Sequence, residues 1–432
     1  MARQRGGGTA RQRGGGTARQ RGGGTARQRG GGTARQRGGG TARSRRRGWL
    51  LAAVLVIAVA VPVGLFLGRD GSGHASFLPA AGGPAPSGTP SPSATRATLT
   101  PRQLAGERVI WSYSGLTPPD SLLTAIGKGE VAGVIFFSDN VSSIAQVRRV
   151  ADRLQAAARK SPLAKPLLLL TDQEGGEIRR LPGEPNQSAK QIGQASDPTA
   201  AAKAAGTGAA ATLSKAGLNV NLAPVLDVYR SPGDLMDQYG RSYSSDPDRV
   251  AKLGSTFVTA QAAGGVLATA KHFPGLGSAG ADQNTDEVPV TLNTTAAQLR
   301  SIDEKPYQRA IAAGVPLVMA SWATYPALDP QHPAGMSHTV IANELRGRLG
   351  FHGVTVTDAL EAGALKSYGD TGHRALAAAA AGMDLLLCSG RDPAQGADAV
   401  TALAAGYQDG SLDRSDFTAA GDRVTALRDG LG

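Results

Sequence analysis

Short apolar runs recur through residues 100–432 and predict a set of buried strands. Most of the runs are apolar at consecutive positions rather than at alternate ones. Such runs are typical of parallel strands that are covered on both faces. We therefore predict eight parallel strands. They span Arg108–Trp111, Gly133–Phe137, Leu167–Thr171, Asn219–Ala223, Leu267–Lys271, Leu317–Ala320, Val354–Thr357 and Asp384–Cys388.

Helical patterns separate these runs. One predicted helix extends to Ala216, with Ser196 or Asp197 as its cap, Pro198 in its first turn and Gly217 as its stop. Another covers 373–381 and is almost entirely alanine and leucine. Strands that alternate with helices indicate βαβ units, and eight such units indicate an α/β fold of the (β/α)8, TIM-like barrel type.

Polar and ionisable residues follow several of the predicted strands. Asp172 follows the third strand, Lys271 and His272 close the fifth, Ser321 follows the sixth and Asp358 follows the seventh. In barrels of this type the carboxyl ends of the strands form the active-site face. The pattern alone therefore predicts an enzyme that acts on a small molecule, with carboxylates and a Lys-His pair around one opening.

The first 48 residues differ in composition from the rest. Residues 2–41 are five copies of Ala-Arg-Gln-Arg-Gly-Gly-Gly-Thr, which has no apolar face and is expected to be disordered. The 14 arginines of residues 1–47 exceed the net charge of +12, which leaves −2 for residues 48–432. This balance argues against nucleic-acid binding by the barrel. The tail itself is either a segment that binds RNA or anionic lipid, or a repeat expansion in which only charge matters.

An uncharged apolar stretch, Trp49–Leu67, is long enough to cross a bilayer. Arginines precede it directly, which favours a cytoplasmic N-terminus and a single-pass signal anchor in the cell membrane. A cleaved signal peptide is the alternative. The predicted organisation is a cytoplasmic tail at 1–48, a transmembrane segment at 49–68, a flexible Pro/Ser/Ala-rich linker at 69–100 and an extracytoplasmic barrel domain at 101–432. The oligomeric state is left open.

Neither a metal nor a cofactor is expected. Cys388 is the single cysteine, and the six histidines show no metal-ligand spacing. Gly275, Gly277 and Gly280 fit a dinucleotide-binding pattern, but no apolar helix follows them, as that site would require.

Several motifs give the chain a resemblance to a known family. In number and order, they resemble those of family 3 glycoside hydrolases, specifically the single-domain bacterial β-N-acetylglucosaminidases, also called β-N-acetylhexosaminidases. They are Gly133-Val-Ile-Phe-Phe, Thr171-Asp-Gln-Glu-Gly-Gly, Arg180-Leu, Asn221-Leu-Ala-Pro-Val-Leu-Asp227, Gly240-Arg-Ser-Tyr-Ser-Ser-Asp-Pro247, Lys271-His-Phe-Pro-Gly275, Met319–Pro326 and Gly353-Val-Thr-Val-Thr-Asp358-Ala-Leu.

The resemblance implies roles for particular residues. It makes Asp358 the catalytic nucleophile of a retaining mechanism, in which an ionised carboxylate forms a glycosyl-enzyme ester. Cations such as Lys271 and Arg241 would keep the pKa of that carboxyl group low. The alternatives are that Asp358 caps a helix, that His272 is a structural histidine, and that the acidic residues after the third strand are loop polarity. The residues that the resemblance assigns to the sugar hydroxyls are Asp172, Arg180, Arg241, Lys271 and His272.

One loop departs from the family pattern. Asp282 is retained, but Asn284 stands where the resemblance implies an acid/base histidine, and an amide cannot transfer a proton at useful pH. Three outcomes remain open: Asp282, Asp286 or Glu287 serves as acid/base, only substrates with good leaving groups are hydrolysed, or the barrel is an inactive sugar-binding domain. The expected function is release of terminal β-linked N-acetylglucosamine from cell-wall-derived glycans. The alternative is a membrane-anchored pseudoenzyme that binds amino-sugar glycan or muropeptide.

Overall fold

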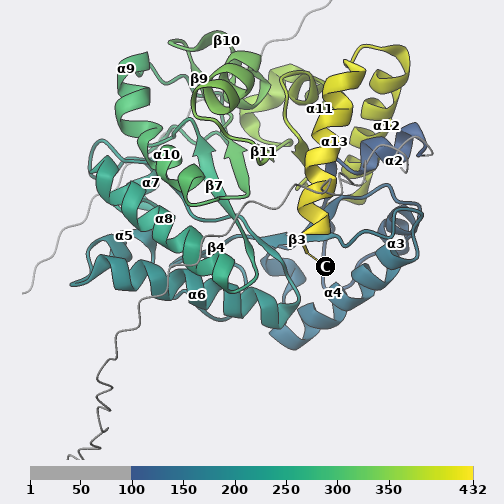
Figure 1. Ribbon diagram of the computed structural model, residues 1–432, viewed down its shortest axis with the longest axis horizontal. Coiled ribbons are helices and arrows are strands. Elements are labelled where there is room, and N and C mark those ends of the chain that lie inside the picture. The colour runs from purple at the N-terminus through teal and green to yellow at the C-terminus, as the bar shows by residue number, and fades with distance from the viewer. Residues whose placement is uncertain (1–98, 432) are drawn as a thin grey trace, which may run out of the picture. The chain divides into compact units, whose positions relative to one another are not determined.

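The computed structural model describes residues 99–431, and these residues form a closed barrel of eight strands (Figure 1). Every neighbouring pair of barrel strands is parallel, and the order around the ring is β1-β12-β11-β8-β7-β6-β3-β2. The predicted barrel is thus confirmed, with each predicted strand in place. The strands are β1 Val109–Trp111, β2 Gly133–Ile135, β3 Leu168–Thr171, β6 Val220–Asn221, β7 Leu267–Phe273, β8 Leu317–Ala320, β11 Val354–Ala359 and β12 Leu385–Leu387.

Helices surround the strands and cover the outside of the barrel (Figure 1). Short 3₁₀ and π segments supplement them, including η1 Ser138–Asn140, η2 Leu299–Asp303, η3 Ala334–Met336, η4 Thr339–Arg348 and η5 Gly363–Tyr368. The α-helices are α2 Pro101–Gly106, α3 Asp120–Gly127, α4 Ile144–Arg159, α5 Ala189–Gly193, α6 Pro198–Ala216, α7 Leu235–Gln238, α8 Pro247–Ala263, α9 Ala296–Gln298, α10 Lys305–Ala312, α11 Thr371–Ala380, α12 Pro393–Asp409 and α13 Arg414–Asp429.

Alternate residues of a strand face the two sides of the barrel wall. Leu168 and Leu170 of β3 belong to one buried apolar cluster with Val354 and Val356 of β11, a strand on the opposite side of the ring. This cluster fills the barrel interior. Leu169, between the two inward residues, joins the other cluster, which includes the helices. Both faces of the strand are therefore buried, which explains why the sequence shows unbroken apolar runs.

Helix ends follow the predicted capping residues. The Asp197 carboxylate accepts hydrogen bonds from the amides of Thr199 and Ala200, and Pro198 begins α6. Gly217 ends this helix with a φ of 75°, a left-handed conformation that favours glycine. The predicted helix at 373–381 begins earlier, at Thr371, because Asp370 caps it through the amide of His373.

Two small antiparallel pairs extend the barrel beyond strand ends. The pair β4 Gln173–Gly175 and β5 Ile178–Arg179 directly follows β3, and the pair β9 Thr324–Tyr325 and β10 Asp329–Pro333 follows β8. The sequence did not predict these pairs. Glu174 lies in β4 and Arg180 directly follows β5, and both contribute to the site described next.

The Arg/Gly repeats, the apolar segment 49–67 and most of the 69–100 linker lie outside the described residues. Within residues 99–431, no helix is both long enough and apolar enough to span a bilayer.

Candidate active site

A cavity of about 430 Å³ opens at the carboxyl ends of the barrel strands. Asp172, His272 and Asp358 enter it from the ends of β3, β7 and β11, so strands far apart in the sequence contribute to one site. Seven of the eight predicted site residues line this cavity, and Asp282 does not. The ionisable lining residues are Asp172, Glu174, Arg180, Arg241, Lys271, His272, Asp286, Asp358, Glu361 and Arg391.

Lys271 joins two carboxylates at the base of the site. Its Nζ lies 2.7 Å from Asp172 Oδ1 and 2.8 Å from Glu174 Oε1, and its side chain is 3% exposed. Burial alone would lower the pKa of Lys271, but the charges of Asp172 and Glu174 outweigh burial and raise it. Lys271 is therefore a fixed cation that holds the two carboxylates in position.

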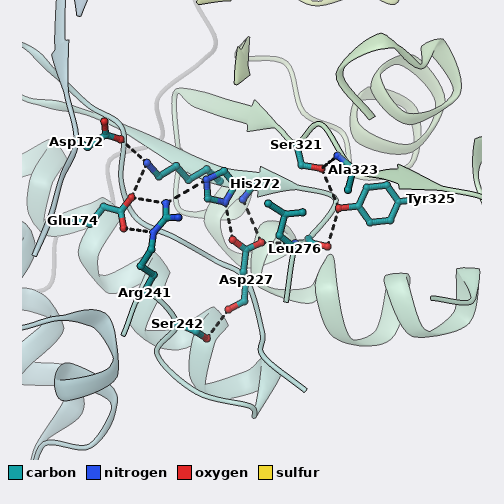
Figure 2. A network of polar contacts seen from close by, with 12 residues as sticks. Asp172, Glu174, Asp227, Arg241, Ser242, His272, Leu276, Ser321, Ala323 and Tyr325 are labelled. Carbon is teal, nitrogen blue, oxygen red and sulfur yellow. Dashed lines mark hydrogen bonds and ion pairs between the residues drawn. The ribbon is translucent and has the colours of Figure 1, made fainter. Parts of the chain in front are cut away.

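Arg241 forms the second cationic contact of Glu174. Its Nε and Nη2 donate to Glu174 Oε2 and Oε1 at 2.9 and 2.8 Å (Figure 2). This bidentate ion pair fixes the guanidinium plane relative to the carboxylate plane. Burial would raise the pKa of Glu174, but Arg241 and Lys271 outweigh it and hold the pKa well below its usual range. Glu174 is thus a permanent anion that orients two cations toward the cavity.

His272 is oriented by a buried carboxylate. Its Nδ1 lies 2.8 Å from Asp227 Oδ2, while its Nε2 faces Arg241 Nη2 at 3.4 Å (Figure 2). A guanidinium group can only donate, so Nε2 presents its lone pair and Nδ1 carries the hydrogen donated to Asp227. Asp227 Oδ1 also accepts from the amide of Leu276 at 2.7 Å, which ties the loop after β7 to the same carboxylate. His272 is buried yet lines the cavity, so packing and a role in binding are both compatible with its place.

Asp358 lies within β11, near its carboxyl end. Its Oδ1 accepts from the amide of Ala359 at 2.8 Å, and it caps no helix. Within residues 99–431, the ion pairs of Lys271 and Arg241 go to Asp172 and Glu174 rather than to Asp358. The two cations therefore act on Asp358 at most through space, and its carboxylate is open to a ligand in the cavity.

Asp286 comes from the loop between β7 and β8. The pKa of its carboxyl group is raised to about 6, first by the negative charge of Asp358 and second by burial, with His272 and Arg241 opposing the shift. The residue as a whole is exposed, which is consistent with the charge of Asp358 being the larger cause. Asp286 therefore keeps its proton to a higher pH than an ordinary aspartate carboxyl group.

The other polar residues of this loop have structural roles or face solvent. Asn284 Oδ1 accepts from the amide of Asp286 at 3.1 Å, and its Nδ2 donates to Glu287 Oε1 at 3.1 Å. Asp282 and Glu287 are exposed and do not line the cavity. The structure thus brings one of the three loop carboxylates, Asp286, into the site.

Glu361 and Arg391 line the cavity and were not predicted from the sequence. Glu361 Oε1 accepts from Ser389 Oγ at 2.5 Å, and its Oε2 accepts from Gln395 Nε2 at 3.0 Å. The Arg391 guanidinium lies over the Phe137 ring, 4.9 Å from its centroid. Glu361 follows β11 and Arg391 follows β12. Because the carboxyl end of every barrel strand is a candidate position, the sequence contained a signal for both residues.

No cluster of three or more histidine, cysteine, aspartate or glutamate residues that could hold a metal ion occurs within the part of the chain that the structure describes. Among the cavity residues, Asp172, Glu174, Arg241 and Lys271 are joined by ion pairs.

A (β/α)8 barrel with several carboxylates and cations around one cavity at the carboxyl ends of its strands defines a class of small-molecule enzymes. The model for the glycosyl hydrolase family 3 N-terminal domain matches residues 108–427. The chain therefore belongs to glycosyl hydrolase family 3, and it is a glycosidase.

Individual relatives agree with this placement. An uncharacterised secreted glycosyl hydrolase of Arthroderma benhamiae is 46% identical over 329 residues, which are 76% of this chain and 93% of the relative. A beta-hexosaminidase of Idiomarina loihiensis is 35% identical over 64% of this chain and 81% of its own length. The crystal structure of a beta-N-acetylhexosaminidase from Beutenbergia cavernae superposes with a TM-score of 0.71 and 32% identity, covering 77% of this chain and 99% of that one.

Proposed function

We propose that this glycosidase is a retaining β-N-acetylhexosaminidase with Asp358 as its nucleophile and Asp286 as its acid/base. The observation that carries the proposal is the pairing of these two carboxyl groups at one cavity, with the pKa of Asp286 raised to about 6 by Asp358. A retaining glycosidase needs one ionised carboxylate and one protonated carboxyl group at the same sugar.

The electrostatic coupling suits both steps of this mechanism. In the first step, Asp358 attacks the anomeric carbon, Asp286 gives its proton to the glycosidic oxygen, and the bond to the leaving sugar breaks. The resulting ester removes the charge of Asp358, which is the largest cause of the raised pKa of Asp286. The pKa of Asp286 then falls, so its carboxylate accepts a proton from the water that attacks the ester and frees Asp358.

The remaining charged groups suit a substrate rich in hydroxyl groups. Asp172, Arg180, Lys271 and His272 border the cavity beside the two carboxylates, and they offer both donors and acceptors. The relatives that are beta-hexosaminidases favour a terminal β-linked N-acetylglucosamine, and cell-wall-derived glycan is the source we propose.

A second candidate is a sugar-binding protein without turnover. Asn284 favours this alternative, because an amide occupies the place where the family resemblance implies an acid/base histidine. We prefer the enzyme because Asp286, two residues further on, lines the cavity and has the raised pKa that the missing group would need.

We also propose that the barrel acts outside the cytoplasm, attached to the cell membrane by residues 49–67. The apolar, uncharged character of this segment and the arginines before it support the proposal. So does the similarity to a secreted glycosyl hydrolase. Fractionation of cells that express the full chain tests it. Recovery of the full chain from membranes by detergent is expected, whereas a shortened product in the medium would indicate cleavage.

The function is tested by hydrolysis of aryl β-N-acetylglucosaminide, aryl β-glucoside and an N-acetylglucosamine-terminated disaccharide by the full-length protein. We expect turnover of both N-acetylglucosaminides, little turnover of the glucoside, and β-configured product immediately after cleavage in an NMR spectrum. Asp358→Ala should lower the rate on the order of 10⁴-fold or more. Sugar binding without turnover of any substrate would favour the binding protein, and α-configured product would contradict the retaining mechanism.

A further inference from the structure

The loop that carries Asp286 is attached by its backbone to the segment that follows Asp358. The amide of Gly363 donates to the carbonyl of Asp286 at 2.7 Å, and the amide of Ala364 donates to the carbonyl of Thr285 at 3.0 Å. Gly363 begins η5, four residues after β11 ends. Because β11 carries Asp358, these two hydrogen bonds set the position of one carboxylate relative to the other.

The contact requires a glycine at position 363. A Cβ atom placed there would lie 2.0 Å from the carbonyl oxygen of Glu287 and 2.2 Å from its carbonyl carbon. Both distances are far below van der Waals contact, and the obstacle is backbone rather than a flexible side chain. Gly363 is buried and its φ is not in the left-handed region, so the close approach of the loop is the reason for glycine here.

The loop itself is shaped for this contact. The amides of Glu287 and Val288 donate to the carbonyl of Asn284 at 3.0 Å, and the Asn284 side chain accepts from the amide of Asp286 at 3.1 Å. Thr285, between them, is 3% exposed. The turn therefore buries Thr285 against the segment after β11 and leaves the Asp286 side chain at the cavity.

We propose that Gly363 is a positioning residue that holds Asp286 in line with Asp358, and that Asn284 supports it by closing the turn. Asn284 then has a structural role, which explains why an amide is present at this position of a working enzyme. The inference rests on the proposed function, because it presupposes that Asp286 transfers the proton. It also requires that the loop is held in place before the substrate binds.

The test compares Gly363→Ala with Asp286→Asn in the full-length protein. Both are assayed with 2,4-dinitrophenyl and phenyl β-N-acetylglucosaminide, whose leaving groups need little and much protonation, respectively. Gly127→Ala is the matched control, because a Cβ atom at that position in α3 would meet no atom within 4 Å beyond its chain neighbours and the nearby backbone of its own helix. Asn284→Ala weakens the turn that carries Asp286 by removing a side-chain hydrogen bond within the loop. It replaces Gly363→Ala as the test variant if Gly363→Ala does not fold.

Misplacement of a catalytic group by about 1 Å is expected to cost on the order of 100-fold. We therefore expect Gly363→Ala to lower kcat/KM for the phenyl substrate about 100-fold, with a much smaller loss for the dinitrophenyl substrate. Asp286→Asn should show the same larger loss on the phenyl substrate than on the dinitrophenyl substrate. Asn284→Ala should show a weaker form of this difference, and Gly127→Ala should not show it.

Azide provides a second measurement. It attacks the anomeric carbon of the Asp358 ester without needing a base, so the carbon–azide bond forms as the ester bond breaks and Asp358 leaves as the carboxylate. Gly363→Ala and Asp286→Asn should both form β-glycosyl azide, since each lacks a base in the correct place, and Gly127→Ala should form mainly the free sugar.

The outcomes separate the two proposals. If Asp286→Asn loses equal activity on the phenyl and dinitrophenyl substrates, Asp286 is not the acid/base and the proposed function is wrong in that respect. If Asp286→Asn loses more activity on the phenyl substrate but Gly363→Ala loses equal activity on both substrates, or behaves like the control, then Gly363 does not position Asp286 and the inference is overturned.

Discussion

Asp286 and Asp358 line one cavity from a loop and a strand, respectively, and the charge of Asp358 raises the pKa of Asp286 to about 6. Asp286 lies between β7 and β8, whereas Asp358 lies within β11. Asp286 therefore keeps its proton to a higher pH than an ordinary aspartate, a difference of the kind that the proposed acid/base role requires.

This coupling predicts a pH profile. A general acid must be protonated, so kcat/KM for phenyl β-N-acetylglucosaminide should fall as the pH rises through about 6, the pKa of Asp286. The dinitrophenyl substrate should lack this alkaline fall, because its leaving group departs without a proton. Rates measured from pH 4 to pH 9 check the prediction. An alkaline fall of equal size in Asp286→Asn would assign it to another group.

Restoring the histidine of the family pattern should not improve this enzyme. Asn284→His removes the side-chain oxygen that accepts from the amide of Asp286, so the turn loosens and Asp286 moves. We expect kcat/KM for the phenyl substrate to fall about tenfold, equivalent to a barrier about 1.4 kcal/mol higher. Steady-state kinetics measure the change, with the dinitrophenyl substrate as internal control. A gain in activity would show that position 284 still serves proton transfer.

The barrel was predictable because its signal is local and repeated. Each strand is covered on both faces, so runs such as the one ending at Thr171 stay apolar throughout, and helix caps such as Asp197 are adjacent to the residues that they cap. The residues that line the site were predictable for a related reason. Side chains that follow parallel strands meet at one edge, which brought Asp172, Lys271 and Asp358 together in the prediction as in the structure.

The partners of these residues were less predictable, because they depend on distances between loops. The sequence suggested Lys271 and Arg241 as the cations that keep the pKa of Asp358 low, whereas in the structure their ion pairs go to Asp172 and Glu174. Nor could the sequence choose among Asp282, Asp286 and Glu287. The contact that holds Asp286 beside the segment after β11 is a backbone hydrogen bond from Gly363, which joins segments more than 70 positions apart.

Asp227 should be important for stability as well as for His272. Its buried carboxylate accepts from His272 Nδ1 and from the amide of Leu276. Asp227→Ala leaves these donors unpaired and should lower the free energy of unfolding by about 3 kcal/mol. Urea denaturation measures this, with Asp152→Ala as a control in an exposed ion pair, where the loss should stay below about 1 kcal/mol. A similar loss in both variants would contradict the role assigned to Asp227.

Lys271→Met should reduce stability in a pH-dependent way. The substitution leaves Asp172 and the buried Glu174 without one cation and should cost about 3–5 kcal/mol at pH 7. The pKa of Glu174 is lowered in the folded protein, so its stabilising effect is complete above its ordinary value of 4.5 and declines as the pH falls below it. The difference between the variant and the unmodified protein should therefore narrow at pH values below about 4.5.

Urea denaturation at pH 7 and pH 3.5 measures this difference for Lys271→Met. Lys305→Met is the matched control, because Lys305 pairs with Asp248 at an exposed position, where the ion pair contributes less than about 1 kcal/mol. A loss of stability in Lys271→Met that is the same at both pH values would contradict this prediction. It would mean that packing of the lysine stem, rather than its charge beside Glu174, stabilises the protein here.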